Sequence, residues 1–231
     1  MLTFRTFSIA FLALALSGCQ LVPGQAGGSG KTRAGATATS GAGPSSGFGS
    51  SLTGAQCLAR LSTTGAEFSP LPSQSFGRGC TQIESVSLGG LMGDTTSFGI
   101  DNIGAVTCEA ANAFAGWVRF GVDRAARAYL GSPLARIETM GSYACRNIAG
   151  SNKRSAHARA EAIDVAAFVL EDGRRIRIDG DWDGGTEAER QFLRVVKKSA
   201  CKRFGTVLSP EYNAAHADHL HLEVGSGSFC R

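Results

Sequence analysis

The chain has 231 residues, with 23 lysines and arginines, 19 aspartates and glutamates, only 4 histidines and an odd number of cysteines, 7. Its composition, 43% hydrophobic and 18% charged, is that of an ordinary soluble protein able to bury one domain-sized core. The net charge of +4 is mild and the basic residues form no run longer than a pair, so no nucleic-acid partner is expected.

Residues 1–18 are typical of an export signal. Arg5 precedes a short apolar stretch at 7–16, too short to span a bilayer as a helix. The following Leu16-Ser17-Gly18-Cys19 resembles the bacterial lipobox, whose cysteine is lipidated before cleavage. We therefore expect a lipoprotein signal peptide and a lipid on Cys19; secretory cleavage beside a coincidental cysteine is the alternative.

The segment that follows predicts where the protein resides. Gln20, rather than aspartate, after Cys19 resembles the signal for sorting to the outer membrane of a Gram-negative cell. The Gly/Ser-rich residues 19–53 predict a flexible linker, because they cannot offset their ordering entropy by burial. We expect a folded domain at 54–231 in the periplasm, held to the outer membrane through the lipid anchor.

Removing Cys19 leaves six cysteines, and an even set in an exported protein predicts disulfides. A thiolate metal site is disfavoured because no CxxC pair is present. Sequence alone does not choose the pairing. We favour the sequential arrangement, which joins Cys57 to Cys80, Cys108 to Cys145, and Cys201 to Cys230.

Hydrophobic periodicity predicts the elements of the domain. In chain order they are a helix at 55–61, a strand at 83–88, a helix at 107–130, strands at 135–143, 162–170 and 174–178, a helix at 186–204, and strands at 206–208 and 219–224. Together they indicate an α+β fold, with a small, mostly antiparallel sheet flanked by helices.

Two helices have clear signals. Thr107 can cap the helix at 107–130, whose apolar stripe ends in Tyr129 and whose opposite face includes Asp123. Thr186 and Glu189 fit a capping box for the helix at 186–204.

All four histidines lie in two short segments, Ser155-Ala-His157-Ala-Arg-Ala-Glu-Ala-Ile-Asp164 and His216-Ala-Asp-His219-Leu-His221. His157 on a loop can converge with Asp164 on the strand after it. Two histidines two residues apart on a strand project to one face. Two histidines and one carboxylate, with a water in fourth place, form the open tetrahedral set of catalytic zinc sites.

These motifs carry a family resemblance. SxHxx(G/A)xAxD followed by HxH resembles zinc peptidases of bacterial cell-wall peptides, among them D-alanyl-D-alanine carboxypeptidases and penicillin-insensitive murein endopeptidases. Most of residues 55–225 also resembles the bacterial extensin-like C-terminal family. The resemblance implies that His157, Asp164 and His221 bind the metal. It further implies that His219 is the base or electrostatic partner of the attacking water, with His216 in the second shell or assisting the transition state.

The same resemblance assigns the segment before the first ligand. Tyr143-Ala-Cys-Arg146 is similar to the Tyr-Arg motif of the carboxypeptidases, in which the arginine stabilises the oxyanion. This chain inserts two residues between Tyr143 and Arg146. Ser155 is expected to orient substrate or a loop carbonyl, and Ala160 replaces a glycine that many relatives carry.

Several side chains have open alternatives. Asp218 either orients a histidine or is solvated, and Glu161 and Glu223 are expected to be exposed strand positions. Trp182 follows a predicted loop and is the better tryptophan candidate for stacking on a sugar. Calcium binding by the nearby aspartates is disfavoured, because the loop lacks its last ligand.

The expected protein is therefore a periplasmic zinc metallopeptidase, with one Zn²⁺ per chain, that hydrolyses peptide bonds in peptidoglycan stem peptides or cross-links. An endopeptidase is favoured over a carboxypeptidase. Its expected partners are peptidoglycan and, through Cys19, a membrane, and the chain is expected to be a monomer. The main alternative is a non-catalytic zinc-containing module that binds the wall; a muramoyl-alanine amidase is a second.

Overall fold

A computed structural model describes residues 54–231 of the chain. The predicted signal peptide, Cys19 and the linker lie outside the described residues. Across 54–231, no helix combines the length and the apolar character needed to cross a membrane.

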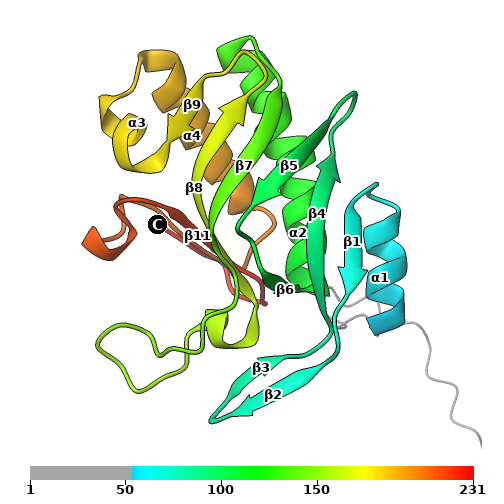
Figure 1. Cartoon of the computed structure of the whole chain (residues 1–231). Coiled ribbons are helices and arrows are strands. Elements are labelled where there is room, and N and C mark those ends of the chain that lie inside the picture. The colour runs from blue at the N-terminus through cyan, green and yellow to red at the C-terminus, as the bar shows by residue number, and fades with distance from the viewer. Residues whose placement is uncertain (1–53) are drawn as a thin grey trace, which may run out of the picture. The chain divides into compact units, whose positions relative to one another are not determined.

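A mixed β-sheet forms the centre of the domain (Figure 1). Its strands are β1 (Glu67–Pro70), β4 (Ser85–Met92), β5 (Ser97–Asp101), β6 (Ala105–Thr107), β7 (Leu134–Gly141), β8 (Ala162–Leu170), β9 (Arg175–Arg177), β10 (Thr206–Leu208), β11 (Leu220–Glu223) and β12 (Phe229–Cys230). The order is β1-β4-β5-β7-β8-β11-β10-β12, with β6 on β4 and β9 on β8. The pairs β5–β7 and β10–β12 are parallel and the other pairs are antiparallel. The α+β class is confirmed, although the sheet is larger than the small one expected.

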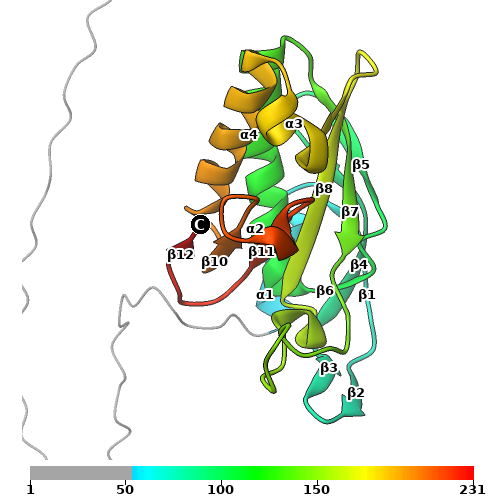
Figure 2. The ribbon, with the colours of Figure 1, turned by 90° about the vertical axis from the view of Figure 1, so that its left-hand side faces the viewer.

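Helices cover one face of this sheet (Figure 2). They are α1 (Gly54–Ser62), α2 (Cys108–Trp117), which continues as π-helical η1 (Val118–Asp123) and η2 (Ala126–Leu130), α3 (Ile178–Gly184) and α4 (Glu187–Ala200). Trp117 of α2 packs edge-on against Phe168 of β8, and Phe168 against Phe192 of α4. These three buried aromatic rings join helices and sheet into one core.

The predicted helix starts are confirmed. The Thr107 hydroxyl accepts a hydrogen bond from the Ala110 N–H, and Thr186 and Glu189 form the reciprocal capping box. These caps pair N–H groups that a helix start leaves without partners.

The far end of the helix at 107–130 differs from the prediction. Asp123, expected on the polar face, is fully buried and accepts hydrogen bonds from the Leu134 N–H and from Arg127. Tyr129, expected in the apolar stripe, is 42% exposed. The reason is the π-helical hydrogen bonding of η1 and η2, which adds residues to each turn and rotates side chains away from the α-helical period.

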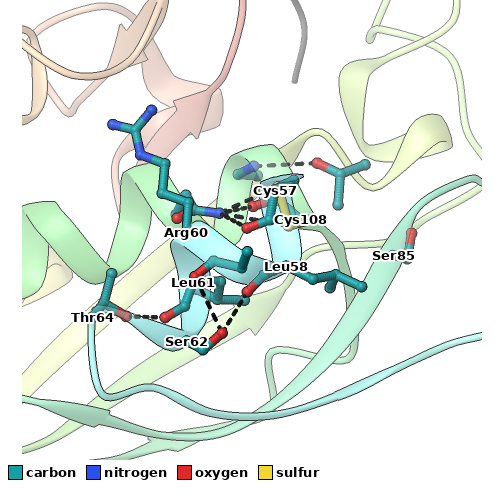
Figure 3. Close-up of a disulfide and its surroundings, with 12 residues drawn as sticks. Cys57, Leu58, Arg60, Leu61, Ser62, Thr64, Ser85 and Cys108 are labelled. Carbon is teal, nitrogen blue, oxygen red and sulfur yellow. Dashed lines mark hydrogen bonds between the residues drawn. A yellow bond between two sulfur atoms is a disulfide. The ribbon is translucent and has the colours of Figure 1, made fainter. Parts of the chain in front are cut away.

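Of the three predicted disulfides, Cys201–Cys230 is confirmed and the other two are wrong. Cys57 pairs with Cys108 (Figure 3), and Cys80 pairs with Cys145. The first bond joins α1 to the start of α2, which packs beside it. The second joins β3 (Cys80–Gln82), which forms a hairpin with β2 (Gln74–Gly77), to the loop after β7. Sequence order carries no information on these tertiary contacts.

The segment expected as a loop around Trp182 is the short helix α3. The Trp182 side chain is 3% exposed, and the guanidinium of Arg194 lies 3.9 Å from its ring centre. This tryptophan is therefore part of the core and is not available to stack on a sugar. The neighbouring Asp179 and Asp183 pair with arginines.

Candidate metal centre

Strands β8 and β11 place two of the predicted ligands beside each other. Asp164 and His221 are direct partners in the antiparallel register. Ile163 and Val165, on either side of Asp164, pack into the core under the helices. Because side chains alternate along a strand, Asp164 and His221 project from the face of the sheet opposite the α-helices.

The third predicted ligand, His157, lies on the 3₁₀ helix η3 (Ala156–Arg159), just before β8. The Ser155 hydroxyl caps this helix by accepting from the His157 N–H at 3.4 Å. Ala160 ends it with φ of +56°, a conformation that glycine adopts with less strain. This φ explains why glycine suits the position that Ala160 occupies.

The donor atoms of these three residues converge. His157 Nε2 lies 3.1 Å from Asp164 Oδ2 and 3.1 Å from His221 Nδ1, which is 2.9 Å from Asp164 Oδ1. One ligand atom from each residue lies within 4.8 Å of the other two, and all three residues are buried. The group that the sequence predicted as ligands is therefore assembled and could bind a metal ion.

Hydrogen bonds behind the two rings decide which nitrogens face the centre. His157 Nδ1 donates to the Ser142 carbonyl at 2.6 Å, and His221 Nε2 contacts the Glu223 carboxylate at 3.4 Å. In a neutral imidazole the opposite nitrogen then carries a lone pair. Two lone pairs and the Asp164 carboxylate thus point at one another, an arrangement that repels itself unless a cation or a proton lies between them. The donor set therefore fits a metal ion.

The pKa values show how this cluster is balanced without a metal. Burial works to raise the pKa of Asp164, but its close contacts with His157 and His221 hold it well below its usual value. Burial also works to lower the pKa of His221, yet Asp164 and Glu223 raise it to about 9. At neutral pH the His221 ring is therefore an imidazolium, protonated on both nitrogens. The second proton supplies the positive charge that the cluster requires.

His219 lies at the edge of the cluster. Its Nε2 is 3.7 Å from Asp164 Oδ1, while its Nδ1 lies 2.7 Å from the Asp218 carboxylate. Because a carboxylate accepts, Nδ1 is the protonated nitrogen of neutral His219 and Nε2 is free to accept a proton on the side of the cluster. Asp218 therefore contacts a histidine that is not one of the predicted ligands, and its side chain is 56% exposed, so it is also solvated.

His216, in η4 (Ala214–His216), completes the row of histidines. Its ring centre is 5.1 Å from that of His219 and 5.9 Å from that of His221, and its Nδ1 contacts Asn213 Oδ1 at 2.7 Å. Burial lowers its pKa to about 4, with further contributions from His219, His221 and the cation of Arg146. His216 is therefore neutral at pH 7.

The predicted substrate-side residues lie on the loop between β7 and η3. Arg146 is exposed and acts on His216 through its charge. Tyr143 is half-buried, with its ring centre 5.4 Å from that of Phe76 in β2. Ser155 is buried as the cap of η3, so its observed contact positions His157. The roles of these residues toward substrate stay predictions.

Sequence reasoning missed two supporting groups. Glu223 was expected to be a solvated strand position, but it contacts the His221 ring. A signal existed, because residues 221 and 223 share a face of one strand. The Ser142 carbonyl carried no signal, since any residue supplies a backbone oxygen. Glu161, also expected to be exposed, instead pairs with Arg159.

Comparison with known proteins identifies the family. Residues 55–231 match the family described as extensin-like protein C-terminus, which is most of the chain, so the protein belongs to this family. No curated protein and no solved structure matches the chain.

Proposed function

We propose that this protein is a zinc metallopeptidase that hydrolyses peptide bonds in peptidoglycan, with an endopeptidase favoured over a carboxypeptidase. The observation that carries the proposal is the convergence of two imidazole lone pairs and one carboxylate at His157, His221 and Asp164. Two nitrogens and one oxygen are a preferred donor set for catalytic zinc, which keeps a fourth position for water.

The surrounding residues suit hydrolysis. When bound, Zn²⁺ polarises a carbonyl group and lowers the pKa of a water ligand to about 7. His219 Nε2, kept free by the bond from Nδ1 to Asp218, accepts the proton of the attacking water. His216 is neutral at pH 7 and donates through Nδ1 to Asn213, so its Nε2 can accept a hydrogen bond from the reacting group, and the fixed charge of Arg146 stabilises the oxyanion.

The proposed substrate rests on the resemblance of both histidine motifs to peptidases of bacterial cell-wall peptides. Export of the chain agrees with it, because three disulfides in the described domain are typical of an oxidising compartment. We further propose that the signal peptide and Cys19 make the protein a lipoprotein of the outer membrane facing the periplasm.

The test combines metal analysis with digestion of purified sacculi. His157→Ala and His221→Ala should lose both bound zinc and the release of muropeptides, whereas His219→Ala should retain zinc and lose cleavage. Product masses identify the bond that is cut. Glu161→Gln, a carboxylate change outside the centre, is the matched control and should behave like the unmodified protein.

Three results would contradict the proposal. Cleavage by protein freed of metal with a chelator would exclude metal-dependent hydrolysis. Zinc-loaded protein that binds sacculi but releases no peptide would establish the non-catalytic wall-binding module instead. Release of intact stem peptides from the glycan would identify an amidase.

A further inference from the structure

An exposed aromatic ring on η1 is surrounded by cations. Phe120 is 44% exposed, although it is a large apolar side chain. The guanidinium carbons of Arg119, Arg124 and Arg203 lie 5.1, 4.8 and 5.5 Å from its ring centre. Arg203 follows the C-terminal end of α4, so two helices contribute to one surface feature.

Positive charge dominates this surface. Asp94 bridges Arg119 and Arg124 at 2.8 and 2.7 Å. Lys202 lines the same pocket as Phe120 and Arg203. Within residues 54–231, neither Lys202 nor Arg203 forms an ion pair with a carboxylate. We call Arg119, Phe120, Arg124, Lys202 and Arg203 the basic aromatic patch. Asp94 pairs with two of its four cations, and the other two, Lys202 and Arg203, are free to attract an anion.

The patch and the candidate metal centre lie on opposite sides of the sheet. The patch belongs to the helical layer, which Figure 2 shows on one side of the strands. Asp164 projects from the other face, because its neighbours Ile163 and Val165 pack under the helices. A surface bound through the patch would therefore leave the metal centre facing away from it.

We propose that the basic aromatic patch docks the domain on an anionic phospholipid surface. Guanidinium groups bind phosphate through paired hydrogen bonds, and each cation near an anionic membrane adds favourable energy. An exposed ring among these cations can enter the boundary between head groups and acyl chains. A free anion would use the charges but would leave Phe120 in water, so the combination favours a membrane. The proposal does not depend on catalysis.

Vesicle binding tests the proposal with residues 19–231 carrying Cys19→Ser, which lack the predicted signal peptide and any lipid anchor. The probes are vesicles of phosphatidylcholine alone and of phosphatidylcholine mixed with phosphatidylglycerol. We expect binding to the anionic vesicles, reduced about tenfold or more by Lys202→Glu with Arg203→Glu. Arg60→Glu with Lys153→Glu changes the net charge equally outside the patch and should retain most of the binding.

A second variant separates the ring from the charges. Phe120→Ser keeps all four cations and should lose the part of vesicle binding that survives added salt, because salt screens charges but not apolar insertion. Circular dichroism confirms that each variant is folded. Equal binding to both vesicle types, equal losses in patch and control variants, or patch-dependent binding to sacculi in place of vesicles would overturn the proposal. Complete competition by millimolar inorganic phosphate would also overturn it.

Discussion

The proton on His221 gives the candidate metal centre a defined pH dependence. A cation reaches His221 Nδ1 only after this proton leaves, and the pKa that governs its loss is about 9. Apparent metal affinity should therefore rise roughly tenfold per pH unit from neutral pH toward that value. Competition with a chromophoric chelator measures the affinity, and calorimetry in two buffers measures the released proton. Affinity that does not change with pH would contradict this account.

The same proton, which competes with metal binding, stabilises the metal-free domain. The pKa of His221 is raised from 6.5 to about 9 on folding, so the protonated ring stabilises the fold fully below pH 6.5. This contribution is lost as the pH rises toward 9. The melting temperature of chelator-treated protein should accordingly fall over this interval.

Glu223 and Glu161 offer a matched pair for testing the support of His221. Both are half-buried glutamates near β8 and β11, but Glu223 contacts the His221 ring whereas Glu161 pairs with Arg159. Glu223→Gln should weaken metal binding about 10- to 100-fold, the usual cost of removing the partner of a ligand histidine. Glu161→Gln should leave it unchanged. Equal affinities in a metal titration of the two variants would exclude this role for Glu223.

At the scale of elements, the Cys80–Cys145 disulfide clamps the loop that supports His157. Within this loop the Ser142 carbonyl accepts from the His157 ring, and the Ala144 N–H donates to the His157 carbonyl. Cys145 is the next residue, and its bond to Cys80 ties the loop to β3. The disulfide therefore limits how far the loop can move from the first ligand.

Replacing the Cys80–Cys145 disulfide should weaken metal binding in addition to lowering the free energy of unfolding. The Cys57–Cys108 bond is a matched control, since the two bonds span 65 and 51 residues and lie in different parts of the domain. By loop entropy each removal should cost about 4 kcal/mol of unfolding free energy. The folded double variant Cys80→Ser, Cys145→Ser should in addition bind the metal more weakly. The folded double variant Cys57→Ser, Cys108→Ser should bind it unchanged. Urea unfolding and metal titration of both double variants give the comparison.

The sequence predicted strongly patterned elements well and weak ones poorly. The range 162–170 matches β8 because its apolar run is continuous, and Thr186 with Glu189 marks the start of α4. The strands β1, β2, β3, β5, β6 and β12 had no counterpart in the prediction, since each has five residues or fewer and too few for a clear alternation in polarity. The burial of Asp123 was likewise hidden, because it follows from π-helical turns that the α-helical period does not describe.

The candidate metal centre was easier to predict than the disulfides. Histidine and aspartate side chains are recognisable as metal ligands from the sequence, and two of the three lie on strands, where the alternation of side chains fixes the face to which they point. The sequence around a cysteine does not indicate its partner, because the pairing depends on which elements pack together. Only the pair that closes the shortest loop, Cys201–Cys230, followed sequence order.

At the scale of the whole molecule, a metal ion would join segments that are distant in sequence. His157 comes from η3, Asp164 from β8 and His221 from β11. An ion bound only by the folded state stabilises it by about 2.7 kcal/mol at a concentration of 100 times its dissociation constant. For a domain of this size that corresponds to roughly 5–10 °C in melting temperature.

Calorimetry of zinc-loaded and chelator-treated protein should therefore show this difference, and His157→Ala should melt at one temperature in both conditions. The basic aromatic patch lies on the other side of the sheet, so Lys202→Glu with Arg203→Glu should leave the zinc-dependent shift unchanged. His157→Ala should in turn leave vesicle binding unchanged. A patch variant that loses the zinc shift would mean that the two faces are coupled through the core.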